Sequence, residues 1–115
     1  MLVQIVNDSP NIRETIKSVL DGLSIEFIEA TDGDQAIRQY AERKPNVVIM
    51  DIDMEQMDGI AATKSIRAMA PNARVIILTQ YDDKDLRAAA WEAGAAEVVL
   101  KDDLLVLGTI FTRHV

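Results

Sequence analysis

Acidic, hydroxyl and ammonium side chains follow the apolar runs of this 115-residue chain, at the points where the runs end. The carboxylates belong to Asp8, Asp51 and Asp53, the hydroxyl to Thr79 and the ammonium to Lys101. Carboxylates that lie close together repel one another, and a divalent cation relieves that repulsion. Oxygen ligands with room for water suit Mg²⁺. The residue types therefore predict a Mg²⁺ site that includes Asp8, Asp51 and Asp53.

The same residues have the chemistry needed to handle a phosphoryl group. A carboxylate such as that of Asp51 can act as a nucleophile and form an acyl phosphate. A bound cation would neutralise charge on the incoming group. The hydroxyl of Thr79 can donate a hydrogen bond to one phosphoryl oxygen, and Lys101 can bring a positive charge to another.

Each residue also has an ordinary structural interpretation. Asp8 can cap a helix, Asp51 can end a strand in a turn, and Thr79 is a typical strand residue. Asp53 and Lys101 are types that usually lie in solvent. The functional interpretation depends on whether the fold brings them to one place.

Short apolar runs alternate with longer amphipathic ones along the chain. The predicted strands are Leu2–Val6, Ile25–Ala30, Val47–Met50, Val75–Leu78 and Glu97–Leu100. Val47–Met50 and Val75–Leu78 are uniformly apolar, as in a parallel sheet covered on both faces. Ile25–Ala30 alternates in part, which is typical of an edge strand.

Helical spacing follows each predicted strand. The first helix is expected to start at Ser9 and Pro10 and to carry apolar residues as far as Leu23. The other helices are expected over Asp32–Lys44 and Asp58–Ala70, around Leu86–Ala93 with Gly94 as C-cap and Trp91 in the core, and around Leu104–Phe111. Five successive strand–helix units predict one α/β domain over residues 1–115, with strand order 2-1-3-4-5.

That strand order predicts where a ligand would bind. In open α/β sheets, ligands lie beyond the carboxyl ends of the strands, where the strand order reverses. Here that point falls between the first and third strands, which are followed by Asn7 and Asp8 and by Asp51. Thr79 and Lys101 end the fourth and fifth predicted strands. The candidate residues are therefore expected at one edge of the sheet.

Composition narrows the classes of partner. The formal net charge of −7 argues against direct contact with nucleic acid or with an anionic membrane surface. No apolar run approaches the roughly 20 residues of a membrane-spanning helix, and no signal leader is expected. The absence of cysteine excludes disulfides and fits a reducing compartment. Cations and proteins with basic patches remain as expected partners.

Four stretches of the sequence, in order and at suitable spacing, resemble the receiver domains of two-component response regulators. Asp51–Gly59 (DIDMEQMDG) is similar to the motif around the family's phospho-acceptor aspartate. Val75–Thr79 (VIILT) resembles the strand that ends in the family's hydroxyl residue, and Gly94–Lys101 (GAAEVVLK) the segment that ends in its lysine. Ile5–Asp8 (IVND) stands where the family usually has an acidic pair. The style of these motifs is closest to receivers attached to helix-turn-helix output domains.

The resemblance implies a flavodoxin-like (βα)5 fold in which Asp51 accepts the phosphoryl group. Asp8 and Asp51 would bind Mg²⁺ through their carboxylates and Asp53 through its main-chain carbonyl, while Thr79 and Lys101 would hold the phosphoryl group. The donor would be a histidine kinase, a phosphotransfer protein or a small acyl phosphate. The resemblance implies a cytoplasmic signalling module, not a turnover enzyme, whose phosphorylation switches its binding to partners.

Several positions depart from the family pattern. Asn7 replaces the first acid of the usual pair and is expected to weaken Mg²⁺ binding. Glu55 stands where the family commonly has proline. Gln80 stands where the family usually has a small residue, and its bulk is expected to narrow access to Asp51. Val98 stands where many members carry an aromatic switch residue.

Two other functions compete with this phosphorylation switch. One is a receiver-like protein-binding scaffold that does not use phosphorylation, which Asn7, Gln80 and Val98 favour. The other is a phosphatase of the haloacid-dehalogenase type, which the order of Asp51, Thr79 and Lys101 superficially copies. The cognate kinase, a C-terminal output domain or downstream target, and homodimer formation are left open by the sequence.

Overall fold

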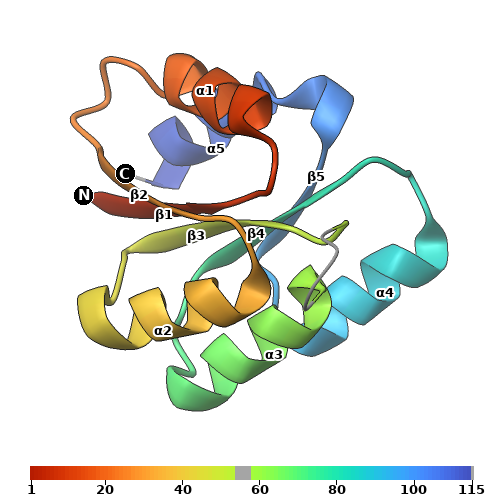
Figure 1. Cartoon of the computed structure of the whole chain (residues 1–115). Helices are drawn as coiled ribbons and strands as arrows, with labels where there is room; N and C mark the ends of the chain where they lie inside the picture. The colour runs from red at the N-terminus through yellow and green to blue at the C-terminus, as the bar shows by residue number, and fades with distance from the viewer. Residues whose placement is uncertain (54–57, 115) are drawn as a thin grey trace.

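The computed structural model describes residues 1–53 and 58–114, which form a single parallel sheet. Its strands are β1 (Leu2–Val6), β2 (Glu26–Ala30), β3 (Val47–Asp51), β4 (Val75–Thr79) and β5 (Glu97–Leu100). Their order across the sheet is β2-β1-β3-β4-β5, as predicted (Figure 1). The strand order therefore reverses between β1 and β3.

Helices cover both faces of this sheet (Figure 1). They are α1 (Pro10–Val19), α2 (Gly33–Arg43), α3 (Gly59–Met69), α4 (Lys84–Ala93) and α5 (Val106–His114), with a 3₁₀ turn over Lys101–Asp103. α1 and α5 lie on one face, and α2, α3 and α4 lie on the other. Across the described residues, none of these helices has the length and apolar character needed to cross a bilayer.

Two apolar clusters, one on each face, hold the helices to the sheet. Ile5 and Ile49 belong to the cluster under α1 and α5, and Val6 and Val48 to the cluster under the other helices. Successive residues of a strand point to opposite faces, so a strand covered on both sides is expected to be mostly apolar. β3 and β4 are buried at every position, which confirms that interpretation of their sequences.

The helices begin and end at residues that suit those positions. Side-chain oxygens of Ser9, Asp32, Asp58 and Asp83 accept backbone N–H groups at the starts of α1, α2, α3 and α4. Such caps satisfy donors that have no partner within the helix. Gly94 ends α4 with a φ of 103°, the left-handed conformation that glycine adopts without strain.

Helix α1 is shorter than its apolar spacing predicts. It ends at Val19, and Leu23 lies exposed beyond it. Between the end of α1 and the start of β2 the chain turns, with positive φ values at Gly22 and Ser24. A right-handed helix cannot contain such values. The spacing at Leu23 therefore continued the helical pattern by coincidence.

Trp91 does not pack in the core as its size and apolar character predict. Its side chain is 49% exposed, whereas Ala90 and Ala93 are buried. Residues on a helix are about 100° apart, so the position next to Ala90 lies outside the stripe that faces the sheet.

Candidate functional site at the carboxyl edge of the sheet

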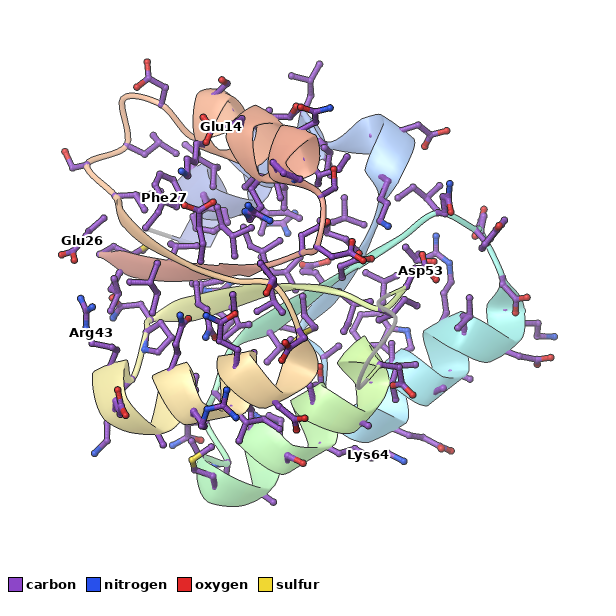
Figure 2. All side chains as sticks on the ribbon, viewed as in Figure 1. Glu14, Glu26, Phe27, Arg43, Asp53 and Lys64 are labelled. Carbon is purple, nitrogen blue, oxygen red and sulfur yellow. The ribbon has the colours of Figure 1, made fainter. Side chains whose placement is uncertain are left out.

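The switch in strand order brings Asn7 and Asp51 to neighbouring positions. β1 and β3 pair as far as Val6 and Met50, so the next residues leave the two strands side by side. Parallel strands lie about 4.8 Å apart, which places the two side chains within reach of one small ligand. Figure 2 shows Asp53 at this same edge of the molecule.

The carboxylate of Asp51 is buried and carries a cation on one oxygen. The residue is 1% exposed, and its Oδ1 lies 2.8 Å from Nζ of Lys101. The same oxygen accepts the backbone N–H of Asp53 at 3.1 Å. Its Oδ2 has no hydrogen-bond partner among the described residues. A buried carboxylate with one satisfied and one open oxygen is suited to receive a further ligand.

Lys101 connects two of the predicted acidic residues. Its Nζ also lies 3.5 Å from Oδ2 of Asp53, and its side chain is 18% exposed. Burial alone would lower the pKa of Lys101, but the hydrogen bond and charge of Asp51, together with Asp53, outweigh burial and raise that pKa above its ordinary value. Lys101 therefore keeps its positive charge at neutral pH.

The two residues that follow β1 face different surroundings. Asn7 is buried, whereas Asp8 is exposed. Asp8 does not cap α1, because Ser9 does so. The helix-capping interpretation of Asp8 is therefore wrong, and its side chain is exposed to solvent.

The donor set fits a partly hydrated Mg²⁺ better than a fully protein-bound metal. Residues 1–53 and 58–114 contain no group of three histidine, cysteine or acidic side chains that could hold a metal ion. The open Oδ2 of Asp51 and the exposed Asp8 offer two carboxylates, and Asp53 also has a main-chain carbonyl. Mg²⁺ commonly binds one or two carboxylates and keeps several waters.

Thr79 lies buried at the end of β4, but its hydroxyl is engaged with the following loop. Its Oγ1 donates to the carbonyl of Tyr81 at 3.3 Å and accepts the N–H of Tyr81 at 3.2 Å. The ring of Tyr81 itself is exposed. If the Thr79 hydroxyl donated its proton elsewhere, it would give up its hydrogen bond to the Tyr81 carbonyl.

Gly59 has a positional role that sequence reasoning missed. A Cβ at this position would overlap the carbonyl oxygen of Asp51 and would lie 2.8 Å from Cα of Ile52. Only glycine lets the start of α3 approach β3 so closely. The available signal was a glycine directly after the N-cap Asp58, where glycine is not a favoured helical residue.

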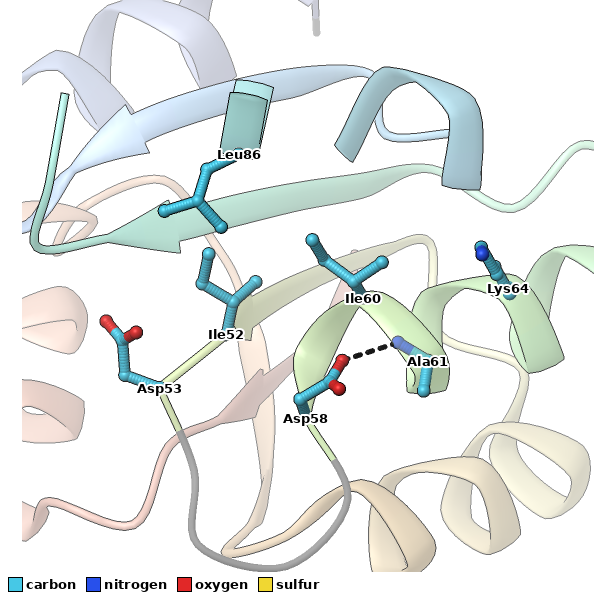
Figure 3. Close-up of a pocket in the computed structure, with 7 residues that line it drawn as sticks. All are labelled: Ile52, Asp53, Asp58, Ile60, Ala61, Lys64 and Leu86. Atoms are coloured by element: carbon cyan, nitrogen blue, oxygen red, sulfur yellow. Dashed lines mark hydrogen bonds between the residues drawn. The ribbon is translucent and has the colours of Figure 1, made fainter. Parts of the chain in front are cut away.

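A pocket of about 400 Å³ lies beside Ile52 and Asp53, which follow β3. Its walls come from the end of β3, the start of α3 and Leu86 of α4, which faces Ile52 and Ile60 (Figure 3). Asp53 and Lys64 are among its polar residues, so the pocket opens beside the residues that surround Asp51.

The departures from the family pattern fall in different places. Gln80 is exposed, and Val98 is partly buried against the cluster under α2, α3 and α4. Because valine has no aromatic ring, Val98 cannot act as the rotating aromatic residue that many family members carry at this position. Glu55, with the rest of residues 54–57, lies outside the described residues.

The fold and the site together define a flavodoxin-like α/β domain whose polar residues gather where the strand order reverses. Residues 3–106 match the response regulator receiver domain, and the chain belongs to that family. It is thus a signalling module of two-component systems and not a dedicated enzyme.

Individual relatives agree with this assignment. The chain is 36% identical over 100 residues to the chemotaxis protein CheY of Thermotoga maritima. The match covers 86% of this chain and 83% of that protein. It is 38% identical over 101 residues to the transcriptional regulatory protein LiaR of Bacillus subtilis. That match covers 86% of this chain but only 48% of LiaR. Its structure matches a chain of the CheX–CheY–BeF3–Mg²⁺ complex from Borrelia burgdorferi with a TM-score of 0.87 and 25% identity, covering 100% of this chain and 90% of that one.

Proposed function

We propose that this receiver domain is a phosphorylation switch that accepts a phosphoryl group on Asp51 in a Mg²⁺-dependent reaction. The observation that carries the proposal is the state of the Asp51 carboxylate. Lys101 neutralises its Oδ1, while its Oδ2 is buried and has no hydrogen-bond partner among the described residues, at the point where the strand order reverses. The proposed domain spans residues 1–115 and acts in the cytoplasm.

The donor would be a phosphohistidine of a histidine kinase or phosphotransfer protein, or a small acyl phosphate. An oxygen of Asp51 forms a bond to phosphorus while the bond from phosphorus to the leaving group breaks. The electron pair of that broken bond stays with the leaving group, either an imidazole that takes up a proton or a carboxylate. The domain would promote this transfer to itself and the later hydrolysis of its own acyl phosphate.

The other residues of the edge have roles that follow from their chemistry. Asp8 and Asp51 would hold Mg²⁺ through carboxylates and Asp53 through its main-chain carbonyl. The ion would supply positive charge to the phosphoryl oxygens. Lys101 would keep its position, and its ammonium would pair with a phosphoryl oxygen. The complex of the Borrelia CheY with BeF3 and Mg²⁺ supports this assignment by similarity.

Thr79 would report the phosphoryl group to the surface. Its hydroxyl would leave Tyr81 to donate to a phosphoryl oxygen, and the loop that follows β4 would rearrange. The rearranged loop would change affinity for a partner, which is a shift between two populated states. The chain spans about half the length of LiaR, a transcriptional regulatory protein. The partner of this chain is proposed to be an output domain or a separate target protein.

Intact mass spectrometry tests the proposal. The protein is incubated with acetyl phosphate, with and without Mg²⁺, beside an Asp51→Ala variant that is shown by circular dichroism to be folded. A gain of one phosphoryl group that needs both Mg²⁺ and Asp51 is expected. A folded protein that gains nothing at any sampling time would favour the protein-binding scaffold. The family match already decides against the phosphatase alternative.

A further inference from the structure

Asn7 is held in one orientation with a single polar group left over. Its backbone N–H donates to the carbonyl of Ala30 at 3.0 Å, and its own carbonyl accepts Nη1 of Arg13 at 2.7 Å. Its Oδ1 accepts the backbone N–H of Ser9 at 2.9 Å. Its Nδ2 is buried and has no partner within residues 1–53 and 58–114. A buried donor without a partner is costly and requires an explanation.

The hydrogen bond from Ser9 fixes which end of the amide faces the site. A half-turn of the amide would place its NH₂ group against the Ser9 N–H, so that two donors would face each other. Arg13 is fixed in turn, because its Nε lies 2.8 Å from Oε1 of Glu29. The Oδ1 of Asn7 is therefore turned toward Ser9, and the NH₂ group is the end of the amide that is left without a partner among the described residues. An NH₂ group donates hydrogen bonds and cannot bind a cation.

An open acceptor lies on the neighbouring strand. Asn7 is two residues beyond Ile5, and Asp51 is two residues beyond Ile49, and both isoleucines belong to the cluster under α1 and α5. Residues two apart on a strand share a face, so Asn7 and Asp51 lie on the same face of the sheet. Asp51 has an Oδ2 that lacks a partner among the described residues. A group with anionic oxygens bound to Asp51 would satisfy the NH₂ group.

We propose that the side-chain NH₂ group of Asn7 donates a hydrogen bond to the phosphoryl group on Asp51 and that Asn7 does not bind Mg²⁺. This inference rests on the proposed function. Asn7 would replace a carboxylate, which binds the cation, with a neutral group that binds the phosphoryl oxygens directly. The site would then bind Mg²⁺ weakly before phosphorylation and tightly only together with the phosphoryl group.

Nuclear magnetic resonance of the ¹⁵N-labelled full chain gives a direct readout. The probe is beryllofluoride, a phosphoryl analogue, added with Mg²⁺, and the Asn7 side-chain resonance is assigned from its absence in Asn7→Asp. One Asn7 NH₂ proton is expected to move downfield and to exchange more slowly with water when beryllofluoride binds. The side-chain resonance of Asn11, which lies exposed on α1, is the internal control and is expected not to move.

Affinities of variants separate the two roles that Asn7 could have. Asn7→Ala is expected to weaken beryllofluoride binding by about tenfold or more, the effect of one lost hydrogen bond to a charged group, and to leave the affinity for Mg²⁺ alone within about twofold. Asn7→Asp keeps an acceptor for Ser9 and is expected to bind Mg²⁺ alone about tenfold more tightly. Asn11→Ala is the matched control.

Each contrary outcome is distinct. A native protein that binds no beryllofluoride would overturn the proposed function and this inference with it. Binding that leaves the Asn7 resonance unmoved would overturn the inference alone. So would a loss of affinity for Mg²⁺ alone in Asn7→Ala, which would make Asn7 a metal ligand. If Asn7→Ala fails to fold, the native resonance and Asn7→Asp decide the question.

Discussion

Asp51 and Lys101 form an ion pair before any phosphoryl group is present, with the carboxylate buried and the lysine partly exposed. Each charge compensates for the loss of water around the other, so removal of one partner leaves an uncompensated buried charge. The same pair keeps Lys101 charged and within reach of a group bound to Asp51. The residue that would stabilise the phosphorylated state thus also stabilises the unphosphorylated one.

Lys101→Met tests this pairing through stability. The variant is expected to lose about 3 kcal/mol of unfolding free energy, because the Asp51 carboxylate stays buried without its cation. Adding Asp51→Asn is expected to restore most of that loss, since the double variant buries no charge. Urea denaturation measures all four proteins of the cycle, with Lys64→Met as the control. Additive losses in the double variant would argue against an energetic link between the two residues.

Among the described acidic residues, Glu29 has a lowered pKa, which makes the stability of the fold depend on pH in the acid range. The hydrogen bond from Lys17 lowers the pKa of Glu29 below its ordinary value of 4.5; burial opposes this, and Arg13 adds to the lowering. The unfolded chain therefore binds the proton more readily, and the stabilisation is present above about pH 4.5 and lost as pH falls below it. Glu29→Gln is expected to lose less stability than the native protein between about pH 6 and about pH 3.

Urea midpoints at both pH values measure the difference. Glu42→Gln, at an exposed position of α2, is the control and should keep the native pH dependence. An unchanged pH dependence in Glu29→Gln would show that the ion pairs of Glu29 with Lys17 and Arg13 do not contribute to it.

At the scale of elements, α3 depends on glycine for its distance from β3. Gly59→Ala would gain about 1 kcal/mol from helix propensity alone. However, the new Cβ would meet the backbone of Asp51 and Ile52, which cannot move as a flexible side chain can. We expect a net loss of about 2 kcal/mol of unfolding free energy.

Gly108→Ala in α5 is a matched control because its Cβ would meet only the carbonyl of Val19, at 3.9 Å. That variant is expected to gain up to about 1 kcal/mol. Thermal unfolding of both variants measures the two signs. A gain in both would contradict the close approach of α3 to β3.

The elements were largely predictable because their signals are local. Apolar runs identified the strands, and Ser9, Asp58 and Gly94 marked ends of helices through chemistry that each residue carries alone. Three-dimensional facts were not predictable in this way. The sequence could not say that Asn7 is buried and Asp8 exposed, since both follow a strand covered on both faces. Nor could it say that Thr79 bonds to Tyr81, which depends on the loop.

At the scale of the whole molecule, the net charge of −7 means that any cation could stabilise the chain by screening. A specific Mg²⁺ site predicts more than screening does. Binding to the folded state alone stabilises it by about 2.7 kcal/mol when the free ligand is 100 times its dissociation constant. The melting temperature of the native protein is therefore expected to rise with Mg²⁺ beyond the rise that NaCl gives at equal ionic strength.

The acceptor site and the rest of the acidic surface can be separated by two variants. Asp51→Asn is expected to remove the Mg²⁺-specific part of the rise, because it removes the carboxylate whose Oδ2 is open within the described residues. Asp82→Asn changes the net charge equally at an exposed position and is expected to keep that part. Because both variants carry the same total charge, a difference between them can come only from where the charge lies. Equal responses would mean that Mg²⁺ acts on the overall charge, and the metal site at Asp51 would have to be abandoned.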